Sequence, residues 1–326
     1  MSVPVPVELI EFIRSGSLFI VAGHKEPDGD CVGSQLALCS ALKRLGKEAV
    51  PCSAGPFKRT EIIPYAAQFS AAPGKTAGAK VVIVDCSSPD RTGELAAHIE
   101  GLPTALIDHH DYHAAGEMRV PAEAPLFLDP AAPSVTVMIL SLIEALGLPL
   151  TKEEAEMLFF GLCTDTGFFR HLDESGAESF SAAQRMIVAG ASPKAAFQAI
   201  NGGKSLSSRI LLGHILSRSE ALFEGRLILS VENFEDTRLF GLEGRDSDSL
   251  YQLLQSVAGV EAIAIIREEA PEKCTVGLRS RDQIDVAAIA ASFGGGGHKN
   301  AAGLSIDGTI SDIKPQIIEA FARVFH

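Results

Sequence analysis

Short apolar runs of strand length alternate with amphipathic stretches of helix length from Leu18 to about Ala189. Three of these runs, Leu18–Val21, Val81–Val84 and Ala105–Ile107, are apolar at every position, whereas a strand with one solvated face would alternate polar and apolar residues. Continuous apolar strands separated by helices are typical of a parallel sheet. The sequence therefore predicts an α/β fold whose N-terminal domain is a parallel sheet with helices on both faces.

The pattern changes after a helical stretch at Leu206–Leu222, which follows Asn201-Gly202-Gly203. Beyond it we expect a smaller α/β domain. Its strands are predicted at Leu227–Leu229, Ala262–Ile266 and Cys274–Leu278, and its helices at Asp248–Val257 and Pro315–Phe325. The predicted organisation is an N-terminal domain over residues 1–191, a linker with a helix over 192–223, and a C-terminal domain over 224–326.

Charge and composition exclude several classes of protein. The formal net charge is -13, and a protein that grips long DNA or RNA needs an excess of Lys and Arg to neutralise phosphates. No apolar run approaches the roughly 18 residues of a membrane span, and Glu8 and Glu11 do not fit the basic flank of a secretory signal. The six cysteines include no Cys-x-x-Cys pair, which favours reduced thiols over a redox pair or zinc site. We therefore expect a soluble cytoplasmic protein that binds no long duplex and no membrane.

Acidic and histidine residues follow three of the predicted strands. The first strand is followed by Gly23-His24-Lys25-Glu26-Pro27-Asp28-Gly29-Asp30, another by Asp85, and a third by Asp108-His109-His110. Because the carboxyl ends of parallel strands meet at one sheet edge, we expect these side chains to gather there. A single Asp after a strand is usually a turn former, and a single His is usually structural. Several carboxylates in one site raise each other's pKa values, and bound cations would relieve that repulsion.

The ligand types indicate which cations these are. Carboxylate oxygens mixed with imidazole suit manganese better than a thiolate-seeking zinc ion, with magnesium or cobalt as alternatives. Two divalent ions roughly 3.5–4 Å apart would hold a bridging hydroxide that attacks a phosphate ester. The sequence therefore predicts a phosphoesterase with two divalent metal ions.

These residues also match a known pattern. The sequence resembles the DHH phosphoesterases in four segments: His24-x-x-x-Asp28-x-Asp30-x-x-Gly33-Ser34, Asp85 after a strand, Asp108-His109-His110, and Thr164-Asp165-Thr166-Gly167. The resemblance implies that His24 and Asp28 hold one metal ion, that Asp30, His109 and Asp165 hold the other, and that Asp85 bridges both. It also implies that Asp108 orients a histidine and that His110 faces the scissile phosphate, so that His110, Asp85 and Asp108 are the catalytic residues. His113 and His171 match nothing in the family pattern and are interpreted as surface or structural residues.

A glycine run lies near the C-terminus, in Gly294-Gly295-Gly296-Gly297-His298. Such a run can bring backbone N–H groups close to an anion, although most glycine runs are flexible turns. Arg279 and Ser280 end a predicted strand in the same domain, and Arg is suited to bidentate phosphate binding, although an arginine there is also compatible with a solvated strand end. The expected substrate-binding residues are Arg279, Ser280, Gly295, Gly296, Gly297 and His298.

This second pattern resembles the DHH-associated C-terminal domain of nanoRNases of the NrnA type, which also act on 3'-phosphoadenosine 5'-phosphate (pAp), and of related cyclic-dinucleotide phosphodiesterases. The resemblance implies hydrolysis of short oligoribonucleotides, linear dinucleotides or pAp, by an oligoribonuclease and pAp phosphatase, and it is compatible with a homodimer. A cyclic-dinucleotide phosphodiesterase is the alternative enzyme. A non-catalytic nucleotide-binding module is the alternative from another class, and the complete set of metal-ligand positions argues against it. The glycine loop argues against a pyrophosphatase, and the acidic charge argues against a RecJ-type exonuclease.

Overall fold

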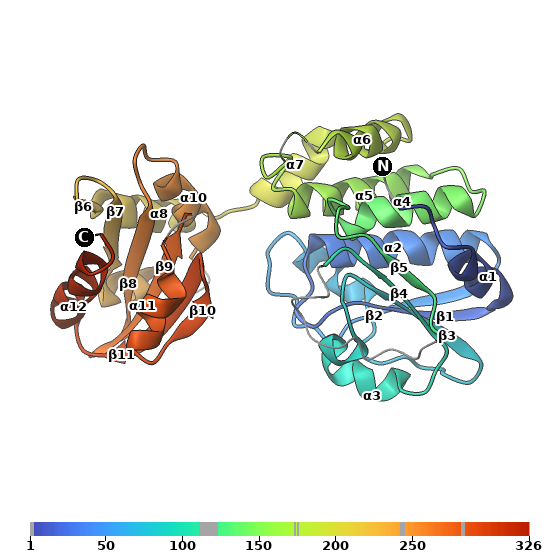
Figure 1. The fold of residues 1–326 in the computed structure, drawn as a ribbon, viewed down its shortest axis with the longest axis horizontal. Helices are drawn as coiled ribbons and strands as arrows, with labels where there is room; N and C mark the ends of the chain where they lie inside the picture. Colours follow the sequence, from blue (N-terminus) through green and yellow to red (C-terminus); the bar gives the residue numbers. More distant parts are fainter. Residues whose placement is uncertain are drawn as a thin grey trace. The chain divides into compact units, whose positions relative to one another are not determined.

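The computed structural model describes residues 3–110, 123–172, 174, 176–241, 245–281 and 284–325, so His113 lies outside the described residues (Figure 1). The chain divides into two compact units, Met1–Gly203 and Lys204–His326. None of the described helices is both long and apolar enough to cross a membrane.

The first unit is built on a five-stranded sheet in the order β2-β1-β3-β4-β5. All of its strand pairs are parallel, as the continuous apolar runs predict. The strands are β1 (Leu18–Ala22), β2 (Glu48–Cys52), β3 (Ala79–Val84), β4 (Thr104–Asp108) and β5 (Leu126–Leu128). The α/β prediction is confirmed, and the three-residue β5 is an element that the sequence pattern did not predict.

Helices cover the two faces of this sheet unequally, as Figure 1 shows. One face carries a thick helical layer, and alternate strand residues such as Phe19 and Val21 share a core with it. The opposite face carries only short elements, which pack on Ile20 and Ile83. The thick layer comprises α1 (Val7–Ser15), α2 (Gly29–Arg44), α4 (Val135–Ala145), α5 (Lys152–Asp165), α6 (Ala177–Val188) and α7 (Pro193–Asn201). The short elements are η2 (Pro89–Leu95) and α3 (Ala96–Ile99), and a further 3-10 helix, η1 (Ile63–Gln68), follows β2.

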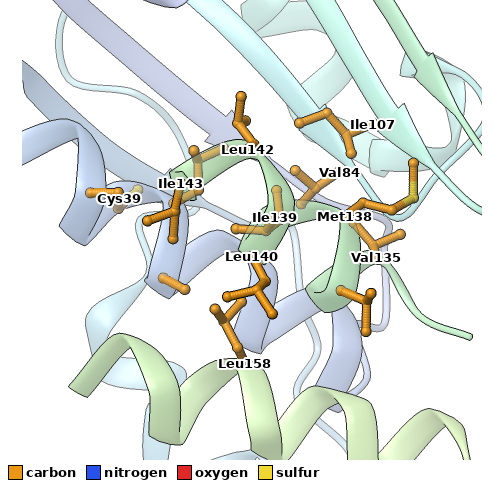
Figure 2. Packing of buried hydrophobic residues seen from close by; sticks show 14 of the residues in the cluster. Cys39, Val84, Ile107, Val135, Met138, Ile139, Leu140, Leu142, Ile143 and Leu158 are labelled. Atoms are coloured by element: carbon orange, nitrogen blue, oxygen red, sulfur yellow. The ribbon is translucent and has the colours of Figure 1, made fainter. Parts of the chain in front are cut away.

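Helix α4 is apolar over most of its surface because it lies largely inside this layer, and its exposed Glu144 pairs with Arg185. Figure 2 shows Met138 and Ile139 near Val84 and Ile107 of the sheet, while Leu140 points toward Leu158 of α5. A helix that is hydrophobic all round is a buried helix. This position fixes the N-terminus of α4 at the carboxyl edge of the sheet.

A buried carboxylate joins α5 to α2. Glu154 is 1% exposed and forms a capping box with Thr151 at the start of α5. Its oxygens also accept hydrogen bonds from Ser40 (2.9 Å) and from Arg44 (2.7 Å), both on α2. Glu154 therefore fixes how α5, which ends at Asp165, packs on α2, which carries Asp30 in its first turn.

We predict that Glu154→Ala lowers the free energy of unfolding by about 3 kcal/mol, because it leaves Arg44 without its carboxylate and removes a helix cap. Chemical denaturation of the metal-free protein measures the change. The control is Lys152→Ala, which breaks an exposed pair with Glu156 and should change the free energy by less than about 0.5 kcal/mol. An equal effect of the two substitutions would contradict the clamping role of Glu154.

The second unit contains a mixed six-stranded sheet in the order β10-β11-β9-β8-β7-β6. Its strands are β6 (Glu220–Leu222), β7 (Leu227–Glu232), β8 (Ala262–Ala270), β9 (Lys273–Ser280), β10 (Gly296–His298) and β11 (Ala301–Asp307). One face packs on a core shared with α8 (Leu206–Ser217) and α10 (Ser247–Gln255), and the other packs on α11 (Val286–Ser292) and α12 (Ile310–Ala322). The short α9 (Phe234–Phe240) follows β7.

Two predictions need correction in this unit. The helix predicted at Leu206–Leu222 ends at Ser217, and Glu220–Leu222 pair with β7 as strand β6. The glycine run is only partly a loop, because Gly296 and Gly297 pair with β11. The sequence did not predict β10 or β11, because glycine and alanine carry little strand signal.

Candidate metal centre

The predicted metal ligands gather at the carboxyl edge of the first sheet. His24 follows β1, Asp85 follows β3, and His109 follows β4, so three parallel strands deliver them to one edge. Asp28 is the N-cap of α2 and Asp30 lies in its first turn, while Asp165 is the last residue of α5.

Asp85 lies between the two histidines that are predicted to bind metal. One of its carboxylate oxygens is 3.5 Å from Nε2 of His24, and the other is 3.8 Å from Nε2 of His109. His24 Nε2 is also 3.8 Å from Asp28, and His109 Nε2 is 3.4 Å from Asp165. The carboxylate of Asp85 thus has one oxygen toward each half of the cluster, which is the arrangement that a bridging ligand requires.

Backbone carbonyls orient both imidazoles. Nδ1 of His24 lies 2.9 Å from the Lys25 carbonyl, and Nδ1 of His109 lies 3.1 Å from the Ala132 carbonyl. Since a carbonyl only accepts, Nδ1 carries the proton in each of these contacts. The other ring nitrogen, Nε2, faces the carboxylates and is the atom available to bind a metal ion. Ala132 is positioned by a turn in which Asp129 accepts the backbone N–H of Ala131.

The start of α4 binds the Asp30 carboxylate. The N–H groups of Val135 and Thr136 donate to its two oxygens at 2.6 Å and 2.9 Å. Free N–H groups at a helix N-terminus favour a negative charge. Asp30 can therefore remain buried (1% exposed) and keep a fixed orientation.

Asp108, the last residue of β4, supports the two histidines that follow it. One oxygen of Asp108 accepts from the backbone N–H groups of His109 (2.8 Å) and His110 (3.2 Å), and it lies 2.7 Å from Nδ1 of His110. Its other oxygen is buried and has no hydrogen-bond partner among the described residues. These contacts agree with the predicted orienting role, which stays a prediction.

The carboxylates are under electrostatic strain without cations. Burial and the neighbouring Asp30 raise the pKa of Asp85 to about 8 and that of Asp165 to about 7. Burial disfavours the charged form of His109, but Asp30 and Asp165 outweigh it and raise its pKa. For Asp28, burial opposes ionisation, yet the His24 imidazole lowers the pKa to about 2. Asp85 also adopts a left-handed backbone conformation (φ 57°), which is uncommon for a residue other than glycine.

The donor set fits divalent cations. Three groups of side chains have ligand atoms within 4.8 Å of one another: His24, Cys31 and Asp85; Asp85, His109 and His110; and Asp30, His109 and Asp165. Oxygen and imidazole donors suit manganese and related ions, and positive charge would stabilise the ionised carboxylates. A divalent metal site is the chemistry that this edge of the sheet supports.

The raised pKa values predict how the stability of the metal-free protein changes with pH. In the folded protein Asp85 keeps its proton up to about pH 8 and Asp165 up to about pH 7. In the unfolded chain both release it near 3.8, the ordinary pKa of an aspartate. Because the native state then binds more protons, the free energy of unfolding should fall as the pH rises from about 5 to about 8.

Excess Mn²⁺ should remove this fall, since bound cations favour the carboxylate form. Melting temperatures across this pH range, with Mn²⁺ and with a chelator, measure both effects. The stabilisation by Mn²⁺ should therefore grow with pH and shrink in Asp165→Asn. A stabilisation independent of pH would contradict the assignment of these carboxylates as ligands.

Sequence reasoning missed two residues near the centre. Asp129 follows β5 just as Asp85 follows β3, so the same pattern could have identified it. Cys31 directly follows a predicted ligand in the first turn of α2, and its sulfur joins the His24 and Asp85 group. The predicted absence of a thiolate site considered only Cys-x-x-Cys spacing, which cannot detect a cysteine among histidine and aspartate ligands.

In the second unit, the strand register brings Arg279 and His298 onto one face. Both residues pair with Ala301 of the strand between them, so the three form a row across β9, β11 and β10. The neighbouring row, Gly277, Gly303 and Gly296, adds no side chains to this face. We call the face formed by these six residues the glycine platform.

Tyr251 of α10 packs on this same face, over Gly277 and beside Arg279. Its ring lies 4.5 Å from the Arg279 guanidinium, a cation–π contact, and a Cβ built on Gly277 would lie 2.1 Å from the tyrosine hydroxyl. Sequence reasoning did not identify Tyr251, because its position depends on a helix packing on a distant strand.

The other predicted substrate-binding residues have packing roles. Ser280 points to the opposite face of β9, where its hydroxyl donates to the Ile284 carbonyl at 2.7 Å. A Cβ on Gly295 or Gly297 would lie 2.4 Å or 2.5 Å from a backbone carbonyl of β11. The structure thus brings together Arg279, Gly296 and His298, and it does not add Ser280 to them.

Family models match both parts of the chain. The model of the DHH family N-terminal domain matches residues 18–162, and the DHHA1 domain model matches residues 237–326. A bifunctional oligoribonuclease and PAP phosphatase NrnA from Thermus thermophilus is 31% identical over 93% of this chain and 87% of its own length. The chain therefore belongs to the DHH family and is a phosphoesterase of the DHH/DHHA1 type.

Other similarities are more distant. A cyclic-di-AMP phosphodiesterase GdpP from Geobacillus thermodenitrificans is 24% identical over 97% of this chain, which spans about half (49%) of that relative. The structure of an exopolyphosphatase-related protein from Bacteroides fragilis superposes with a TM-score of 0.76 at 20% identity, covering 97% of this chain and 94% of the other. Exonuclease RecJ bound to manganese gives a TM-score of 0.54 at 18% identity, covering 99% and 95%. Both of these solved structures share the fold of this chain.

Proposed function

We propose that this phosphoesterase hydrolyses very short oligoribonucleotides, linear dinucleotides and pAp. The observation that carries the proposal is the convergence of His24, His109 and the carboxylates around Asp85 at one sheet edge. Similarity to the NrnA relative over nearly the whole chain supports this choice of substrate class.

In this proposal the cluster binds two divalent ions, with manganese preferred and magnesium or cobalt as alternatives. Bound ions would supply Lewis-acid polarisation of the phosphate and activation of water. The chain's own residues supply the geometry: Asp85 faces both histidines, and the start of α4 holds Asp30. In this proposal Asp108 orients His110, whose imidazole is 42% exposed and therefore accessible to a phosphate.

The glycine platform would bind the part of the substrate away from the scissile bond. Arg279 carries a positive charge, and its contact with Tyr251 limits the conformations of the guanidinium. Gly296 has no atom within 4 Å of a built Cβ, so a ligand can approach the backbone there. A net charge of -13 favours short substrates over long strands.

Two earlier expectations stay predictions. Cytoplasmic localisation fits the six free, buried cysteines. A homodimer is compatible with the family. Similarity to the GdpP relative supports the alternative, a cyclic-dinucleotide phosphodiesterase. Cyclic dinucleotides are therefore tested in the same assay.

An activity panel with Mn²⁺ tests the proposal. We expect the highest kcat/KM on RNA of two to five nucleotides or on pAp, and a decline on longer RNA, because the net charge of -13 repels the phosphates of added nucleotides. Asp85→Asn, the control, should be slower by about a thousandfold or more, since it removes the charge shared by both halves of the cluster. Circular dichroism shows whether the variant is folded.

Each contrary result identifies another function. A clear preference for cyclic dinucleotides would favour the alternative phosphodiesterase. Undiminished activity on long single strands would favour a RecJ-like exonuclease. Metal binding without turnover of any substrate would leave a nucleotide-binding module.

We predict that Arg279→Ala raises KM for a dinucleotide by about ten- to a hundredfold with little change in metal content, because it removes a charge-assisted phosphate contact in the second unit. Arg279→Lys should recover part of this loss, since lysine keeps the charge but not the planar fork.

Arg281→Ala is the matched control. Arg281 lies two residues away, and its guanidinium donates to the backbone carbonyl of Gln255, so its loss should change KM less than about twofold. Steady-state kinetics and metal analysis of the same preparations measure both effects. If Arg279→Ala strips the metal or leaves KM unchanged, the platform is not the substrate clamp.

A further inference from the structure

A buried thiol belongs to one half of the metal centre. Cys31 is fully buried, and its Sγ lies within 4.8 Å of ligand atoms of both His24 and Asp85. The other half of the centre, formed by Asp30, His109 and Asp165, offers only oxygen and imidazole nitrogen. The two halves therefore differ in the softness of their donors.

Local packing fixes the position of this sulfur. A Cβ on Gly23 would lie 2.1 Å from Sγ, so the glycine after β1 makes room for the thiol. Gln35 donates from Nε2 to the carbonyls of Val21 and Cys52, both at 2.8 Å, which orients its Oε1 toward the thiol at 3.5 Å. The sulfur is thus confined beside His24.

We propose that Sγ of Cys31 is a ligand of the metal ion bound by His24 and Asp85. The proposal rests on the metal centre and is independent of the substrate. On binding, the thiol gives its proton to solvent, its hydrogen bond to Gln35 is lost, and the sulfur forms a bond to the ion. Tetrahedral bonds to sulfur and nitrogen separate ligand atoms by about 3.5 Å, so side-chain shifts of about 1 Å suffice.

This ligand makes the two metal positions unequal. A thiolate favours Co²⁺ or Zn²⁺ over Mn²⁺, whereas the Asp30, His109 and Asp165 group has no such preference beyond the general order of affinities. A protein loaded from a mixture of Co²⁺ and Mn²⁺ should place Co²⁺ first at the position with the cysteine.

Cobalt spectroscopy tests the proposal without an activity assay. The Co²⁺-loaded protein should show a near-ultraviolet sulfur-to-cobalt charge-transfer band, and Cys31→Ala and Cys31→Ser should both lose it. The control is Cys86→Ala: Cys86 is also buried and directly follows Asp85, but its sulfur faces the Ser88 carbonyl at 3.6 Å, so the band should persist. In competition, Cys31→Ser should hold less Co²⁺ relative to Mn²⁺ than the unmodified protein.

The outcomes separate this inference from the proposed function. Cobalt uptake without the band, or a band that survives in both Cys31 variants, overturns the thiol ligand and leaves the metal centre intact. A protein that binds no divalent metal overturns both. Loss of the band in both variants with their melting temperatures and Mn²⁺ binding retained supports Cys31 as the ligand.

Discussion

Several contacts in the first unit offset the electrostatic repulsion among carboxylates that are buried together at one edge of the sheet. Parallel strands bring their carboxyl ends together, and this chain places Asp85 and the first residues of α2 there. Without cations the pKa of Asp85 rises to about 8, so the metal-free fold retains a proton that the ion-binding form must release. The N–H groups of Val135 and Thr136 and the carbonyl contacts of His24 and His109 each stabilise or orient one member of this cluster.

The same constraint explains the helical layer. Asp30 lies in the first turn of α2 and Asp165 is the last residue of α5, so the packing of the two helices sets the distance between two predicted ligands that are far apart in sequence. The Glu154 contacts with Ser40 and Arg44 fix that packing at the opposite end of α2. Helix α4, largely enclosed in this layer (Figure 2), brings its N-terminus to Asp30 through the N–H groups of Val135 and Thr136. Hydrophobic burial thus positions the predicted ligands at one edge of the sheet.

The sequence predicted the elements with a strong local signal. The apolar runs identify β1, β3 and β4, and the residues after them are the ones that gather at the edge. The three-residue β5 escaped because so short a run carries no periodicity. Strands β10 and β11 were not predicted because glycine and alanine carry little strand signal. The close packing of Gly297 on β11 is visible only in the tertiary structure. Tyr251 and Cys31 escaped for the same reason: their contacts cross between elements.

In each unit a glycine packs against a side chain that takes part in one of the proposals. Gly23 lies against the Cys31 sulfur, and a side chain there would displace the thiol from His24. Gly277 lies against the Tyr251 hydroxyl, and Tyr251 in turn supports the Arg279 guanidinium. In each case the missing Cβ of the glycine leaves the space that a proposed functional group or its support occupies. The role of these two glycines is therefore visible only in the tertiary structure, where the side chain packed against each one is identified.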